Sequence, residues 1–302
     1  MTEKQTIYVI GGPTASGKSA HALKLADETS GVIINADSMQ IYDGLHLLTA
    51  QPPLEDLKQA PHRLYSALHP NTPCSAGNYR EMVEPMIHEL LSKGQTPIIV
   101  GGSGLYIRAL ISGLSPIDDI PPAIRNAANS MQKELGNPAF YEELKKRDPI
   151  MAARFHPYHT ARLIRAWEVL EATGKSLAQW QEQPLIGPPD DWEFDIKLII
   201  PPRDILYKRC NDRFIWMMDN GALDEVSAFH EGLKSGAIDA GVPLTEALGV
   251  PELINYINGV YGLDEAIMRA QGQTRRYAKR QTTWFNNQIK PQKNIAKIEI
   301  LS

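Results

Sequence analysis

The sequence predicts an α/β protein whose core is a parallel β-sheet, interrupted by an inserted all-helical domain. Over roughly the first hundred residues, short apolar runs alternate with helical periods, which is typical of βαβ units. From residue 118 to about 183 every pattern is helical, and stretches rich in proline lie on both sides of this segment. We therefore expect a core of residues 1–117 and 191–302 and a helical insert over residues 118–190.

The elements of the core follow from its hydrophobic pattern. Thr6–Ile10 is predicted as the first strand, and a helix is predicted from Lys18 to about Thr29 because alanine and leucine recur on one face. Later strands and helices alternate, and they are predicted over residues 32–35, 79–91, 97–100 and 105–111. In the insert, the clearest helix is His159–Thr173, which ends before Gly174 as its C-terminal cap.

After the insert the chain returns to the core with one more buried strand, Phe194–Ile200. The rest of the chain is predicted to be helical, with helices over residues 203–219, 223–233, 251–257 and 263 to about 285.

A complete phosphate-binding motif lies between the first strand and the first helix. Residues 12–19 fit G-x-x-x-x-G-K-[S/T], and they are Gly12, Pro13, Thr14, Ala15, Ser16, Gly17, Lys18 and Ser19. The glycines allow backbone N–H groups to point inward and, with the helix N-terminus, to hold an anion. Lys18 adds a positive charge on the phosphates, and the Ser19 hydroxyl is a ligand for Mg²⁺. The motif predicts a P-loop NTPase-like core.

The acid that usually holds Mg²⁺ in nucleotide-hydrolysing enzymes is missing. The strand over residues 97–100 ends in Gly101-Gly102, where those enzymes carry an aspartate. The second strand delivers Asp37 instead, at the edge of the sheet where ligands bind. Asp37 is either a general base beside the phosphate site or the cap of a turn. Ser103, in the glycine-rich turn Gly101–Gly104, either stabilises an oxyanion or caps the next helix; both roles are compatible.

Charge and composition narrow the functional classes. Net charge is −4, yet residues 269–297 hold eight Lys or Arg and no acid, and residues 144–166 hold six Lys or Arg and a single Asp. These segments form either a surface for a polyanion or solvated helix faces. Two distant cysteines argue against a disulfide framework or a zinc site and suit a reducing, cytoplasmic location. We expect no secretory leader, no membrane span and, by default, a monomer.

Seven segments, in order along nearly the whole chain, resemble the bacterial tRNA dimethylallyltransferases. They are GPTASGKS at 12–19, DSMQIY at 37–42, TAQP at 49–52, PHRL at 61–64, GGSGLYIRAL at 101–110, RLIRAWEVLEATGKS at 162–176 and TRRYAKRQTTW at 274–284. The resemblance implies that the phosphate loop holds the diphosphate of dimethylallyl diphosphate with Mg²⁺. It also implies that the dimethylallyl group passes to N6 of the adenosine on the 3′ side of a tRNA anticodon.

The resemblance also implies roles for single residues. Asp37 would accept the N6 proton, while Lys18, Thr14 and Arg213, with Mg²⁺ on Ser19, would stabilise the departing diphosphate. The insert would clasp the anticodon stem-loop. The residues implied to contact tRNA are Asp37, Ser38, Met39, Gln40, Ser103, Arg125, Ala161, Arg162, Leu163, Ile164 and Arg165.

The chain departs from the family pattern at several positions. Ala161 stands where glutamine is usual, which removes one expected contact, and Val250-Pro251 replaces a stretch that usually carries a basic residue. Ser103 replaces threonine but keeps the hydroxyl. Two other functions stay open on the motifs alone: a P-loop kinase that uses ATP to phosphorylate a nucleoside or small alcohol, and an RNA-binding protein without catalysis.

Overall fold

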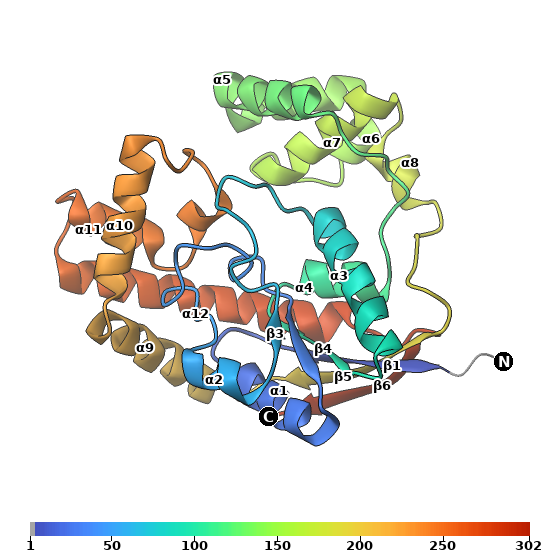
Figure 1. The fold of residues 1–302 in the computed structure, drawn as a ribbon. Coiled ribbons are helices and arrows are strands. Elements are labelled where there is room, and N and C mark those ends of the chain that lie inside the picture. The colour runs from blue at the N-terminus through green and yellow to red at the C-terminus, as the bar shows by residue number, and fades with distance from the viewer. Residues whose placement is uncertain (1–3) are drawn as a thin grey trace. The chain divides into compact units, whose positions relative to one another are not determined.

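The computed structural model describes residues 4–302 and has a parallel six-stranded sheet with the strand order β3-β2-β4-β1-β5-β6 (Figure 1). All five neighbouring pairs are parallel, so the predicted parallel α/β core is confirmed. The strands are β1 Gln5–Gly11, β2 Val32–Asn35, β3 His62–Arg63, β4 Pro97–Gly101, β5 Trp192–Ile199 and β6 Ile295–Leu301.

Twelve α-helices and a short 3₁₀-helix, Pro243–Glu246, are present in the described residues. The α-helices are α1 Lys18–Thr29, α2 Leu54–Gln59, α3 Ala76–Ser92, α4 Gly104–Ile111, α5 Pro122–Arg147, α6 Pro149–Ala152, α7 Thr160–Thr173, α8 Leu177–Gln181, α9 Arg203–Asp219, α10 Ala222–Ser235, α11 Val250–Ile257 and α12 Leu263–Gln288. Nowhere in the described chain is a helix both long and apolar enough to span a bilayer.

The chain forms two compact units. The first joins the segment up to Ile111 with the segment from Pro188 onward, and the second covers Ser112–Gly187. Helices α5 to α8 lie together in the second unit, as Figure 1 shows. Their core is apolar and centres on the fully buried Phe140, Leu144 and Leu163.

Alternation along the strands divides the core of the first unit between the two faces of the sheet. In β1, Ile7 and Val9 belong to the large apolar cluster on one face, which includes side chains of α3, α4 and α12. Ile10 belongs to the cluster on the other face, where Ala22 and Leu25 of α1 pack. Successive side chains of a strand point to opposite faces, so a β1 buried on both faces sits at the centre of the unit.

Most predicted elements are confirmed to within a few residues, and β2 and α9 match their predicted bounds. The prediction of an all-helical tail is wrong at its end, because Ile295–Leu301 pairs with β5 as an edge strand. Helix α2 and the two-residue strand β3 were not predicted. Gly136 has a φ of 72° inside α5, so this segment is two helices joined at a kink.

The strand order brings three loops to one edge of the sheet. The carboxyl ends of β1, β2 and β4 are neighbours, since β4 lies between the other two. The phosphate loop, the segment that begins with Ala36-Asp37, and the Gly102–Ser103 turn therefore start side by side.

Candidate active site

The phosphate loop curls because two of its glycines adopt backbone angles that other residues rarely accept. Gly12 has a φ of 150° and Gly17 a φ of 100°. A Cβ at Gly12 would lie 2.3 Å from the carbonyl oxygen of Ile199 at the end of β5. The loop backbone therefore packs directly on the neighbouring strand before it enters α1, and only glycine fits at this position.

Two polar side chains of the loop are placed to bind an anion. Lys18 Nζ donates to the Pro13 carbonyl at 2.7 Å, and burial lowers the pKa of Lys18 to about 8 despite the opposing charge of Asp37. The Ser16 hydroxyl is buried and has no hydrogen-bond partner among the described residues. Buried polar groups without partners are uncommon, and a phosphate oxygen would pair with the Ser16 hydroxyl. The Lys18 ammonium has further N–H groups that can donate to the same anion.

Asp37 lies just beyond β2 and is held by a polar turn. Its N–H donates to Asn35 Oδ1 at 2.8 Å, and its Oδ1 accepts the Met39 N–H at 3.0 Å. Asn35 is fully buried and also donates to the carbonyls of Asp37 and Leu64. The turn-capping interpretation of Asp37 is thus confirmed for one carboxylate oxygen. No hydrogen bond to the other oxygen, Oδ2, is found among the described residues, so that oxygen is available for proton transfer.

Ser103 joins the segment after β2 to the segment after β4. Its hydroxyl accepts the Ser38 N–H at 2.8 Å and donates to the Ser38 hydroxyl at 3.0 Å. Both hydrogen bonds of the Ser103 hydroxyl are with Ser38. The hydroxyl therefore positions Ser38 and does not cap α4.

Gly101 explains why no acid follows β4. A Cβ at Gly101 would lie 2.0 Å from the carbonyl oxygen of Ala36, because the chains after β2 and β4 touch backbone to backbone. An aspartate at this position would need the two segments to separate.

Helix α9 supplies two arginines to the phosphate loop. Arg213 Nη2 donates to the Thr14 hydroxyl, and Arg209 Nη1 donates to the Ser16 carbonyl at 3.2 Å. Burial lowers the pKa of the Arg213 guanidinium, while the nearby Cys210 and Asp37 oppose this effect. Arg213, which was predicted only through the family resemblance, does lie in the site.

Two chambers meet at this group of residues. A polar chamber of about 430 Å³ is lined by the phosphate loop from Thr14 to Ser19 and by polar side chains of Gln40, Tyr65, Arg209 and Asp212. A second chamber, of about 210 Å³, has an apolar side made of Met39, Leu48, Phe214, Met217, Ala247 and Leu248. Both chambers are lined by Thr14, Asp37, Thr49 and Arg213.

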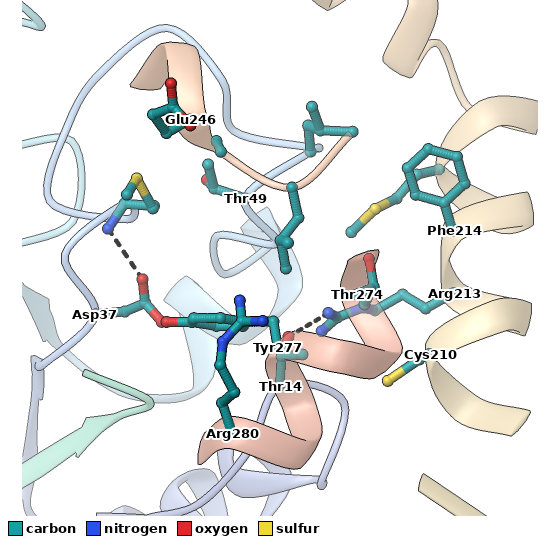
Figure 2. Close-up of a pocket in the computed structure, with 15 residues that line it drawn as sticks. Thr14, Asp37, Thr49, Cys210, Arg213, Phe214, Glu246, Thr274, Tyr277 and Arg280 are labelled. Carbon is teal, nitrogen blue, oxygen red and sulfur yellow. Dashed lines mark hydrogen bonds between the residues drawn. The ribbon is translucent and has the colours of Figure 1, made fainter. Parts of the chain in front are cut away.

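Figure 2 shows the second chamber, with Phe214 and Asp37 on opposite sides and the Arg213 side chain directed to Thr14. Tyr277 of α12 also lines it, and burial together with the charge of Asp37 raises the pKa of its phenol. Charged and apolar surfaces thus face each other across a short distance, which suits a ligand with an anionic head and an apolar tail.

Helix α12 contributes residues that the sequence analysis did not single out. Gln281 is buried; its Oε1 accepts the Thr14 N–H at 2.9 Å and its Nε2 donates to the Gly102 carbonyl at 2.9 Å. The basic character of α12 serves several purposes: Arg280 lines the second chamber, whereas Arg275 donates to Asn211 at 2.6 Å. The sequence carries no local signal for Gln281, because Gln271, Gln273 and Gln288 lie in the same helix.

In the second unit, the residues predicted to contact tRNA differ in exposure. Ala161 and Arg162 are exposed at the start of α7, while Ile164 and Arg165 are partly buried. Leu163 is fully buried in the helical core, so its side chain supports α7 and is not presented to a partner. Arg125 and Arg165 each form an ion pair with the buried Glu168, at 3.8 and 3.6 Å.

A metal ion in this site would depend on few protein ligands. No group of three or more His, Cys, Asp or Glu that could hold a metal occurs in residues 4–302. Ser19 is exposed at the start of α1 and lines the polar chamber. This donor set fits Mg²⁺, which commonly takes one or two protein ligands and completes its shell with phosphate oxygens and water.

Comparisons with known proteins agree with this geometry. The family model of the IPP transferases matches residues 40–288. The chain is 45% identical to the tRNA dimethylallyltransferase of Rhodospirillum centenum over 289 residues, covering 96% of this chain and 91% of that protein. It is 47% identical to the tRNA dimethylallyltransferase of Paramagnetospirillum magneticum over 290 residues, covering 96% and 90%.

Solved structures show the same fold. The full-length tRNA isopentenylpyrophosphate transferase of Bacillus halodurans superposes with a TM-score of 0.66 at 31% identity, over 98% of this chain and 91% of that one. A eukaryotic dimethylallyltransferase acting on tRNA superposes with a TM-score of 0.80 at 25% identity, over 93% of this chain and 70% of that one. The chain therefore belongs to the IPP transferase family.

Proposed function

We propose that this protein transfers a dimethylallyl group from dimethylallyl diphosphate to N6 of the adenosine on the 3′ side of the anticodon in tRNA. The observation that carries the proposal is the meeting of two chambers at Thr14, Asp37, Thr49 and Arg213. The phosphate loop lines one chamber and apolar side chains line much of the other. A diphosphate with a five-carbon tail matches this division, since each part of the ligand meets a surface of its own polarity.

The reaction exchanges one bond for another. The bond between C1 of the prenyl group and the diphosphate oxygen breaks, and its electron pair leaves with the diphosphate. A new bond forms between C1 and N6 of the adenine, and N6 loses one proton. Asp37 Oδ2 accepts that proton, because Oδ1 is already engaged by the Met39 N–H.

Cationic and hydroxyl groups stabilise the charge that grows on the leaving diphosphate. Lys18 and Arg213 bring positive charge to the polar chamber, which the phosphate loop lines. The Thr14 hydroxyl accepts a hydrogen bond from Arg213, which leaves its own hydrogen free for an oxygen of the diphosphate. When bound at Ser19, Mg²⁺ would supply further neutralisation of the diphosphate.

The helical unit is assigned to the anticodon stem-loop. The exposed Arg162 and the partly buried Arg165 lie one helical turn apart on α7, and Arg125 shares with Arg165 the buried carboxylate of Glu168. That carboxylate attracts both guanidinium groups to one place on the unit, and their N–H groups can donate to phosphate oxygens. Phosphate contacts of this kind supply much of the affinity for RNA.

A kinase that uses ATP is the alternative, and two features disfavour it. Gly101 stands where such enzymes carry the metal-binding acid, and a larger residue there would collide with the Ala36 backbone. The relatives that are 45% and 47% identical to this chain are tRNA dimethylallyltransferases, and neither is a kinase.

Transfer itself is tested with radiolabelled dimethylallyl diphosphate and unmodified tRNA. We expect the label on tRNA and, after digestion, on a single modified adenosine. A parallel reaction with labelled ATP and candidate alcohols tests the kinase. A phosphorylated small product without labelled tRNA would contradict the proposal, and binding of tRNA without either product would indicate a protein without catalysis.

Replacing Asp37 with asparagine tests the general base. The carbonyl oxygen of the new amide can still accept the Met39 N–H, so the turn persists while the acceptor of the proton is lost. We expect kcat to fall by about 10²- to 10⁴-fold, the usual contribution of a general base. The affinity for tRNA should stay within about twofold, as filter binding would measure. An unchanged kcat would refute the assignment of Asp37.

Diphosphate affinity should depend on pH through Lys18. Burial holds the pKa of Lys18 at about 8 in the free protein, and a neighbouring diphosphate raises it because it favours the ammonium form. Binding therefore takes up a proton above about pH 8, and the Kd for the diphosphate should rise between pH 8 and 9, by up to about tenfold per unit. Isothermal titration at several pH values measures this.

Lys18→Arg serves as the reference for that titration, because arginine stays charged and reports only the ionisation of the ligand. Lys24→Gln, on the exposed face of α1, is the matched surface control. A Kd that does not change between pH 7 and 9 in the wild type, relative to Lys18→Arg, would contradict the role of Lys18.

The salt dependence of tRNA binding tests the helical unit. Arg162→Gln should weaken binding and lower the slope of log K against log salt by about 0.7 to 0.9, the value for one lost phosphate contact. At saturating tRNA, kcat should not change. Lys145→Gln is the control, since Lys145 is an exposed base of the same unit paired with Glu142. Equal slopes for the wild type and Arg162→Gln would rule out the contact.

A further inference from the structure

Gln281 bridges two loops of the site with one buried amide. Its Oε1 accepts the Thr14 N–H and its Nε2 donates to the Gly102 carbonyl, each at 2.9 Å. The Gln281 side chain comes from α12, 267 positions after Thr14 and 179 after Gly102. The amide therefore connects the phosphate loop to the turn after β4. The site is built from both of these segments.

The close approach of α12 explains the glycines of this turn. A Cβ at Gly102 would lie 2.4 Å from Gln281 Nε2 and 3.4 Å from Asp37 Oδ2. A Cβ at Gly104 would lie 2.3 Å from the ring of Trp284, one turn further along α12. Helix α12 thus packs against the bare backbone of this turn. The Gln281 amide and the Asp37 carboxylate both lie next to Gly102.

An amide is the chemical group that this bridge requires. One partner is a donor and the other an acceptor, and both are uncharged backbone groups. Glutamine offers a carbonyl oxygen and an NH₂ group on one rigid plane, whereas lysine and arginine only donate and an ionised glutamate only accepts. Glutamine at position 281 therefore satisfies both partners, which a lysine, an arginine or an ionised glutamate could not do.

The bridge also limits the conformation of Thr14, because it binds the Thr14 backbone N–H. The Thr14 N–H donates to Gln281, so it is not the loop N–H that an anion would use. The Thr14 hydroxyl accepts from Arg213. With both groups fixed, the threonine presents its hydroxyl to the junction of the two chambers in one orientation.

We propose that Gln281 is a positioning residue for prenyl transfer, acting through Thr14 to hold the diphosphate loop in register with the Asp37 carboxylate. The inference rests on the proposed function. Gln281 is not among the residues that line the two chambers. It would act by setting the spacing between the group that stabilises the leaving diphosphate and the group that accepts the proton.

Gln281→Met tests the role, because methionine keeps the length and volume of the side chain and removes both hydrogen bonds. A misplacement of about 1 Å can cost up to about 10²-fold in rate, and we expect kcat to fall by about 10- to 100-fold. The KM for the prenyl diphosphate should rise, while the Kd for tRNA stays within about twofold. Thr282→Val is the control, since the Thr282 hydroxyl donates to the Ala278 carbonyl of its own helix.

Amide hydrogen exchange gives a readout that does not depend on activity. In the wild type the Thr14 N–H should exchange slowly, and in Gln281→Met it should exchange faster, while amides in β5 keep their rates. Calorimetry gives the unfolding temperature of each variant. All comparisons are then made at one temperature at which every variant is folded. Exchange at Thr14 that is unchanged by Gln281→Met would overturn the bridge itself.

A double-mutant cycle separates positioning from general loss of stability. Thr14→Val removes the hydroxyl through which Gln281 is proposed to act, so the losses in kcat of Thr14→Val and Gln281→Met should combine to much less than their product. Losses that multiply would overturn the action through Thr14, as would a normal kcat in Gln281→Met. If the wild type transfers no prenyl group at all, it is the proposed function that fails, and the exchange result still reports on the bridge.

Discussion

Close packing against bare glycine backbone at the carboxyl edge of the sheet is the constraint on which the rest of this structure depends. The loops that follow β1 and β4 approach their neighbours so closely that no Cβ fits at Gly12, Gly101 or Gly102. The contacts lie against a β5 carbonyl, the Ala36 carbonyl and the Gln281 amide. Packing of bare backbone at three places turns loop N–H groups and carbonyls toward defined partners, and it leaves Asp37 and Thr14 on the walls of one site.

The same closeness determines the electrostatics. Lys18 and Arg213 are both partly buried near Asp37, and burial lowers the pKa of each despite the opposing charge of that carboxylate. An anion entering the polar chamber would relieve the cost of keeping these cations away from water. The site is therefore prepared for a polyanionic ligand, and the adjoining apolar chamber defines what the rest of that ligand is.

Local pattern predicted much of the fold because local physical chemistry dictates it. The phosphate motif, with a buried strand before it and an amphipathic helix after it, placed the start of α1 at Lys18, and the alternation of elements indicated a parallel sheet. Strand β6 was missed, because an exposed edge strand at the end of the chain carries a weak apolar signal and its partner β5 lies about 100 residues earlier. The kink at Gly136 was likewise hidden inside a continuous helical period.

The sequence by itself determined the chemistry available to this protein: a loop that binds phosphate, an aspartate after the second strand, a glycine where an acid is usual, and basic helices. Only the tertiary structure decided how these groups are joined. The Gln281 bridge links residues 267 positions apart, Arg213 reaches Thr14 across 199, and the two chambers share walls from separate helices and loops. Such contacts depend on the register of packed elements, which no local pattern encodes, because they arise only when distant segments are buried against one another.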